Sequence, residues 1–190
     1  MHRRVYERPA EWNELRYKRV YNPTLYTDML LEEYEEFESA KTLVDKLDGL
    51  SDIFFISVGA LWKLREAPYK FIYRNYKEVL DYPEVNEARI RYSSILKNTV
   101  TRVLDAQDAD MMILKYRICH LLTILNYEFA ALGLNELEAE LAINIICDSN
   151  DSKEMVELAS IDKGQLKGAK FIPPTKRLNL LVEMVQDEEA

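Results

Sequence analysis

The amino-acid sequence predicts an all-α protein, a helical bundle with an extended segment near its C-terminus. Glycine (5) and proline (6) are scarce among the 190 residues, whereas the helix formers Leu, Glu, Ala and Lys are abundant. Apolar side chains recur at three- and four-residue spacing along most of the chain. The exception is IDKGQLKGAKFIPP, residues 161–174, which is polar, contains glycines and ends in two prolines. With 48% hydrophobic residues, the chain can bury a core, and we expect a single domain covering residues 1–190.

Break and capping signals divide the sequence into helices. Asn22-Pro23-Thr24 interrupts the pattern and supplies capping side chains for a second helix. Thr42 and Asp45 form a capping box that opens a third helix, and Gly133 stands where a helix C-cap favours glycine. The helices we expect cover approximately residues 7–20, 25–40, 42–65, 69–80, 84–104, 109–132, 135–148 and 174–186.

The second expected helix carries carboxylates where a core-facing helix normally carries apolar side chains. Glu33 and Glu36 are three residues apart and therefore share a face. That face continues through apolar side chains of the kind that a helix buries. These side chains are Met29, Leu30, Phe37 and Ala40.

The third expected helix repeats this pattern. Asp48 and Asp52 are four residues apart, and their face continues through Phe55 and Gly59. No Lys or Arg lies three or four residues from Asp52, so no local ion pair explains it. The helix is apolar nearly all round between residues 47 and 62, which predicts that it is buried.

Four carboxylates at one helix–helix interface would repel one another and would be costly to desolvate. A divalent cation resolves both problems, and hard oxygen ligands suit Mg²⁺, with Mn²⁺ as an alternative. Solvated surface charge is the competing interpretation, and we expect it to hold for Glu32, Glu35 and Glu38. The buried character of the third helix favours the metal site.

Other reactive side chains are assigned to the core. Cys119 and Cys147 both lie in apolar helical stretches, which predicts buried thiols. His120 lies in the apolar stretch ICHLLTIL without a second histidine nearby, so we expect a packed core histidine. The aromatic residues of the middle helices stand at helical spacing and are likewise expected in the core.

Charge and hydropathy exclude several classes of protein. A formal net charge of −8 argues against general binding to nucleic-acid backbones, which requires a basic surface. No apolar run approaches the length of a membrane helix, and the start MHRRVYERPAEW lacks the apolar segment of a secretory signal. We therefore expect no membrane partner and a cytoplasmic location, in a bacterium or, for a phage protein, in its host.

Three stretches, in this order, resemble the all-α nucleoside triphosphate pyrophosphohydrolases of the MazG and phosphoribosyl-ATP pyrophosphohydrolase type. E-E-Y-E-E, Glu32–Glu36, is similar to the E-E-x-x-E motif of that superfamily. D-G-L-S-D-I-F-F, Asp48–Phe55, resembles its second metal-binding helix. S-N-D-S-K, Ser149–Lys153, and K-G-A-K-F-I-P-P, Lys167–Pro174, resemble the C-terminal motifs of phage and bacterial members.

The sequence departs from the family pattern at several positions. The second motif is usually E-x-x-D, but Gly49 stands three residues before Asp52, and Asp48 can supply the missing carboxylate from the same helical face. Cys147 stands where relatives often have histidine. The segment from about residue 64 to 121 resembles a helical insertion, which could cap the pocket, form an oligomer interface or replace a partner subunit.

The resemblance implies hydrolysis of an NTP or dNTP to the monophosphate and pyrophosphate. It implies that Mg²⁺ is held by carboxylates and that Glu32 is the general base. It also implies that lysines, hydroxyls and an amide near the C-terminus contact the phosphates. The implied metal ligands are Glu33, Glu36, Asp48 and Asp52, and the implied substrate-binding residues are Ser149, Asn150, Ser152, Lys153, Lys167 and Lys170.

Two other functions remain open at this stage. One is a non-catalytic nucleotide-binding or regulatory module on the same scaffold, which Gly49 and the insertion favour. The other is a phosphoribosyl-ATP hydrolase of histidine synthesis, with the same chemistry on another substrate. Because relatives build their bundles from two or more chains, the resemblance implies a homodimer or higher homo-oligomer, although a chain with this many helices could complete a bundle alone.

Overall fold

The computed structural model describes residues 1–65, 85–108, 110–154 and 167–188, and this part of the chain contains seven α-helices and no strands. The all-α prediction is therefore confirmed. The helices are α1 (Arg3–Arg16), α2 (Pro23–Ser39), α3 (Leu43–Lys63), α5 (Val85–Leu104), α6 (Met111–Ala131), α7 (Glu136–Asp151) and α8 (Thr175–Glu188).

Helix α3 is the centre of the bundle. It packs against α1, α2, α6, α7 and α8. Between residues 47 and 62 every residue is buried except Asp48 and Asp52, which are half-buried. The expectation that this helix is buried is confirmed, and its two aspartates mark the only positions of this stretch that retain substantial contact with solvent.

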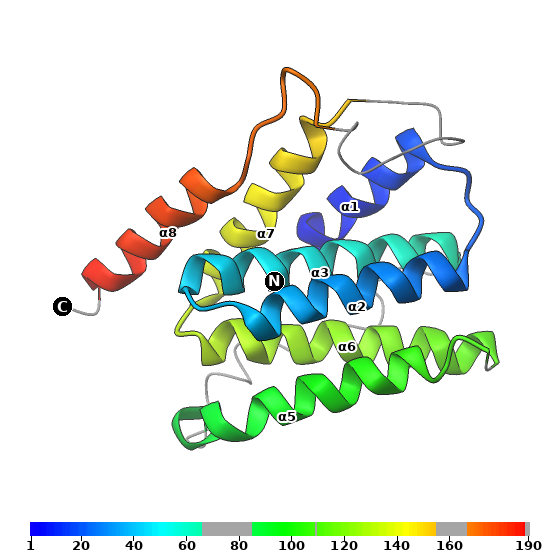
Figure 1. The fold of residues 1–190 in the computed structure, drawn as a ribbon, viewed down its shortest axis with the longest axis horizontal. Coiled ribbons are helices and arrows are strands. Elements are labelled where there is room, and N and C mark those ends of the chain that lie inside the picture. The colour runs from blue at the N-terminus through cyan, green and yellow to red at the C-terminus, as the bar shows by residue number, and fades with distance from the viewer. Residues whose placement is uncertain (66–84, 109, 155–166, 189–190) are drawn as a thin grey trace.

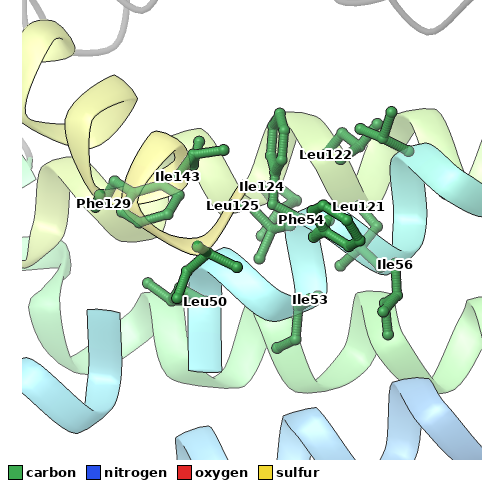
Figure 2. Close-up of a cluster of buried hydrophobic side chains, with 14 of the residues drawn as sticks. Leu50, Ile53, Phe54, Ile56, Leu121, Leu122, Ile124, Leu125, Phe129 and Ile143 are labelled. Carbon is green, nitrogen blue, oxygen red and sulfur yellow. The ribbon is translucent and has the colours of Figure 1, made fainter. Parts of the chain in front are cut away.

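The core lies where α3 faces α6 and α7. Figure 2 shows side chains of α3 directed toward side chains of these two helices. Phe54 and Phe129 are the largest side chains that are fully buried. The labelled members of this cluster are Leu50, Ile53, Phe54, Ile56, Leu121, Leu122, Ile124, Leu125, Phe129 and Ile143. This packing sets the position of α3, on which the candidate carboxylates depend.

The remaining helices cover the faces of α3 that α6 leaves open. In Figure 1, α2, α3, α6 and α5 run nearly side by side, and α5 packs on α6. Helices α1, α7 and α8 lie obliquely to this group and pack on α3. Residues 167–173 contain no helix, as the glycine- and proline-containing sequence predicts.

Local interactions mark several of the helix boundaries that the sequence predicts. The Asn22 side chain accepts a hydrogen bond from the backbone N–H of Leu25 (3.2 Å), and Thr42 Oγ1 accepts one from that of Asp45 (3.1 Å). Gly133 follows α6 with φ 92°, the left-handed conformation that glycine adopts without steric cost. Local capping interactions therefore explain the expected breaks at Asn22, Thr42 and Gly133.

Two predicted boundaries are wrong. The first helix covers Arg3–Arg16 rather than residues 7–20, because Tyr17 adopts an extended conformation (φ −129°, ψ 150°) and ends it. Helix α7 continues beyond the expected residue 148 to Asp151, and Asn150 Nδ2 donates to the carbonyl of Ile146 inside it (3.1 Å). The helix expected at residues 69–80 lies outside the described residues, as does part of the expected insertion at 64–121.

Two core assignments are also wrong. His120 is exposed on α6 rather than packed in the core, and Tyr116, one turn before it, is 73% exposed. Both belong to the outer face of α6, where the apolar pattern continues past the part that α3 covers. The two cysteines are buried and free, as expected.

Gly49 explains one departure from the family pattern. A Cβ atom built on Gly49 would lie 3.0 Å from Cβ and 3.1 Å from Cα of Phe37, so α2 and α3 approach each other closely at this point. A larger side chain at this position would require α2 and α3 to move apart slightly. Glycine three residues before Asp52 therefore permits the close packing of the two helices.

We expect Gly49→Ala to lower the free energy of unfolding by about 1–2 kcal/mol, because the overpacking cost against Phe37 exceeds the gain in helix propensity. Ser51→Ala provides the matched control on the same helix. Ser51 is buried and its Oγ has no hydrogen-bond partner among the described residues, so its removal should leave stability unchanged or slightly higher. Urea unfolding of both variants tests this, and a Gly49→Ala variant as stable as the wild type would contradict the close approach of the helices.

Candidate functional site

The α2–α3 pair brings the four predicted carboxylates together. Glu33 is half-buried and Glu36 is exposed on α2, and both face the half-buried aspartates of α3. The charge of Glu33 acts on Asp52, and that of Glu36 acts on both Asp48 and Asp52. The structure thus places the four side chains at one helix–helix interface, as their spacing predicts.

The two aspartates are poorly solvated for carboxylates. Burial raises the pKa of Asp48 to about 6, and the charges of Glu36 and Asp45 add to the effect. Burial also raises the pKa of Asp52 well above its ordinary value, assisted by the charges of Glu33 and Asp48. Asp48 Oδ1 is buried without a hydrogen-bond partner among the described residues. A buried carboxylate oxygen of this kind is short of a positively charged or hydrogen-bonding partner.

Lys153, which follows the C-cap of α7, supplies positive charge that acts on both aspartates. Its charge lowers the pKa of both Asp48 and Asp52, and so opposes the effect of burial. Its Nζ donates a hydrogen bond to Asn150 Oδ1 (2.6 Å). Lys167 also acts on Asp48 and lies over the Phe171 ring, 5.4 Å from its centroid. Two of the three predicted phosphate-binding lysines are therefore at the carboxylate cluster.

The third lysine differs. Lys170 is exposed, and within the described part of the chain it forms no ion pair. Glu32, the predicted general base, is exposed on α2 beside Glu33. Glu35 and Glu38 are exposed as well, in agreement with their assignment to the solvated face.

The predicted serines and asparagine of the S-N-D-S-K motif are held by other parts of this chain. Ser149 and Asn150 are buried, with exposed fractions of 5% and 4%. Ser152 Oγ donates to the carbonyl of Ser149 (2.7 Å) and accepts a bond from the backbone N–H of Ile172 (2.8 Å). The motif therefore connects the end of α7 to the segment that carries Lys167, and Asn150 holds the Lys153 ammonium.

Trp12 on α1 also contacts this motif, and the sequence did not predict this contact. Its Nε1 donates to the backbone carbonyl of Asn150 (2.9 Å), and its ring packs edge-on against Phe55 of α3 (5.3 Å between centroids). Trp12 therefore bridges the Asn150 backbone and the α3 helix one turn beyond Asp52. Its apolar helical position gave no indication of this hydrogen bond.

Arg8 is a second residue that sequence reasoning missed. Its guanidinium donates to Asp148 (2.7 Å) and Asp151 (2.7 Å) on α7, and Asp148 also pairs with Arg177 of α8. These ion pairs lower the pKa of Asp148, although its partial burial opposes the effect. The long sequence separation of the partners explains why no local pattern pointed to them. Together they fix the end of α7, and with it Lys153.

The donor set suits a hard divalent cation. The four acidic side chains provide only oxygen atoms, and Asp48 Oδ1, which has no hydrogen-bond partner among the described residues, is of the kind that such a cation binds. In the described part of the chain, however, no three Asp, Glu, His or Cys side chains converge closely enough to hold one ion. The chemistry of the residues fits a metal, and the side chains would have to draw together to bind it.

Comparison with known proteins found no matching family model, no matching curated protein and no matching solved structure. None of the described helices is both long and apolar enough to cross a membrane.

The raised pKa values predict a dependence of stability on pH. Between the ordinary carboxyl pKa of about 4 and the raised value, the folded state binds more protons than the unfolded state, so stability falls as pH rises through this window. Removing the negative charge of one aspartate should reduce this loss of stability. We expect Asp52→Asn to be more stable than the wild type at pH 7 without divalent cations, by about 1 kcal/mol, and equally stable at pH 4.

Urea unfolding at the two pH values, with chelator, measures this difference. Glu35→Gln, on the exposed face of α2, is the control and should change stability little at either pH. The pKa of Glu128 on α6 is raised to about 7 by burial and by the charge of Glu38, so it titrates in the same range. Its contribution is common to all three proteins and cancels. An Asp52→Asn protein less stable than the wild type at pH 7 would contradict this prediction. It would show that neighbouring groups fully compensate the negative charge of Asp52 in the folded state.

Proposed function

We propose that this protein is a Mg²⁺-dependent nucleoside triphosphate pyrophosphohydrolase, which hydrolyses an NTP or dNTP to the monophosphate and pyrophosphate. The observation that carries the proposal is that four carboxylates lie along the α2–α3 interface, where their charges and that of Lys153, which follows α7, act on Asp48 and Asp52. Such a site combines ligands for a cation with a group for a polyanion. The motif resemblance adds the reaction type.

Glu33, Glu36, Asp48 and Asp52 would hold the cation, with Mn²⁺ as an alternative to Mg²⁺. When bound, the ion would neutralise charge at phosphorus and lower the pKa of a coordinated water. The raised pKa values of the two aspartates support this assignment, because they mark carboxylates whose charged form lacks compensation.

Residues of α7 and of the following segment would bind the triphosphate. The charge of Lys153 acts on both aspartates that would hold the metal and that of Lys167 acts on Asp48, which supports a role for these two lysines in contacting phosphate oxygens. Asn150 orients the Lys153 ammonium through its 2.6 Å hydrogen bond. Glu32, exposed next to Glu33, would accept the proton of the attacking water.

A non-catalytic nucleotide-binding module is the second candidate. It is favoured by the absence, among the described residues, of three acidic side chains that already converge on a single point. The carboxylates and Lys153 would then bind a metal–nucleotide complex without positioning a water for attack. For either function we propose a cytoplasmic protein that forms a homodimer or a higher homo-oligomer, as the family resemblance implies.

Pyrophosphate release from a panel of NTPs and dNTPs with Mg²⁺ tests the proposal. We expect Asp52→Asn and Glu33→Gln each to lose about 100-fold or more in kcat/KM, because each removes a charged metal ligand. Glu35→Gln removes one charge from the same helix on its exposed face and should keep wild-type activity.

The other outcomes are equally informative. Absence of turnover, combined with a rise in Tm on adding Mg²⁺ and nucleotide that Asp52→Asn abolishes, would support the binding module. Absence of both turnover and stabilisation would contradict both candidates and leave the carboxylate cluster as a feature of the fold.

A further inference from the structure

A hollow lies between α5 and α6, and its described lining comes from these two helices alone. The lining residues come from the C-terminal half of α5 and the N-terminal half of α6, and they enclose a volume of about 290 Å³ that is open to solvent. This approaches the range of roughly 300–1,000 Å³ that is typical of small-ligand sites. The described lining consists of Thr99, Arg102, Ile113, Tyr116, Arg117 and His120.

The hollow is basic in a chain with a formal net charge of −8. Two guanidinium groups and an imidazole line it, and none of the described lining residues is acidic. Neither Arg102 nor Arg117 forms an ion pair with a carboxylate in the described part of the chain. The pKa of His120 is lowered, first by burial and then by the charge of Arg102, so these two groups lie close together. Two guanidinium groups without a carboxylate partner among the described residues, beside an imidazole that can donate a hydrogen bond, favour an anionic ligand.

Arg117 is already fixed in position. Its Nη1 donates a hydrogen bond to the backbone carbonyl of Arg102 (2.7 Å), which joins the two helices across the hollow. This bond leaves the remaining N–H groups of the Arg117 fork to bind another acceptor. A guanidinium held in this way loses little conformational entropy when it binds a phosphate.

The remaining lining suits an apolar or planar group. Tyr116 is 73% exposed and Ile113 is 47% exposed, although both are large hydrophobic side chains. Thr99 is almost fully buried, and its hydroxyl donates to the carbonyl of Ile95 (2.8 Å). The hollow thus presents basic groups beside an exposed aromatic ring, a combination that can bind an anion and stack a planar ring.

We propose that the α5–α6 hollow binds a phosphate monoester that carries a planar ring, of the class of a nucleoside monophosphate. Arg102, Arg117 and His120 contact the phosphate, and Tyr116 and Ile113 contact the ring. The site is separate from the carboxylate cluster, because its described lining includes no residue of α2, α3 or α7. It requires no metal, and it does not depend on the proposed pyrophosphohydrolase activity.

Calorimetric titration of the full chain with AMP, inorganic phosphate and adenosine, in the presence of EDTA, tests the site. We expect AMP to bind more tightly than inorganic phosphate or adenosine. Arg102→Gln should weaken AMP binding about tenfold or more, since it removes charge-assisted hydrogen bonds. The carbonyl of Arg102 that Arg117 contacts belongs to the backbone, so this bond survives the substitution. Lys97→Gln removes one charge from an exposed position of α5 outside the hollow and should leave the Kd within about twofold.

Two further variants keep the result interpretable. Tyr116→Ala should weaken AMP but not phosphate, because only the ring contact is lost. Asp52→Asn should leave AMP binding in EDTA unchanged. The proposal is overturned if AMP does not bind at millimolar concentration, if Arg102→Gln and Lys97→Gln have equal effects, or if Asp52→Asn abolishes binding and thereby assigns AMP to the carboxylate cluster.

Discussion

The burial of α3 is the constraint on which the rest of the molecule depends. Between residues 47 and 62 this helix contacts five others and has no solvated face, so a charge on that stretch must be compensated by a neighbour or else lowers the stability of the fold. Asp48 and Asp52 are the half-buried exceptions within the stretch, and the charges of α2 and of Lys153 act on both. The neighbouring helices supply more negative charge through Glu33 and Glu36, and positive charge chiefly through Lys153. The stability of the apolar core is what allows this arrangement to persist.

The position of Lys153 is itself the result of several unrelated contacts. Asn150 binds its ammonium, Trp12 binds the backbone of Asn150, and Arg8 binds α7 through Asp148 and Asp151. Helix α1 therefore supports the position of Lys153, although it contributes none of the four carboxylates. This indirect support is typical of sites that need a charged group at a fixed place.

The sequence predicted the fold class, most helix boundaries and the shared face of the four carboxylates, because these follow from local periodicity and capping chemistry. It failed where the outcome depends on distant partners. Tyr116 and His120 continue an apolar pattern but lie on a face of α6 that no described helix covers. Arg8 and Trp12 bond to residues of α7 that lie more than a hundred positions away in the sequence. The spacing of residues along the chain therefore cannot predict these bonds. Gly49 appeared to be a missing ligand, and its packing against Phe37 was visible only once α2 and α3 were placed side by side.

The short connection between α2 and α3 also has a consequence for the order of folding. Only residues 40–42 separate the two helices, so the carboxylates meet through a local antiparallel hairpin. Their counter-charge, Lys153, follows helix α7, about a hundred residues further along the chain. Contacts that are close in sequence form earlier than distant ones, because less loop entropy is lost. During folding, the hairpin therefore brings its negative charges together before the lysine reaches them, so we expect their repulsion to be greatest in a partly folded chain.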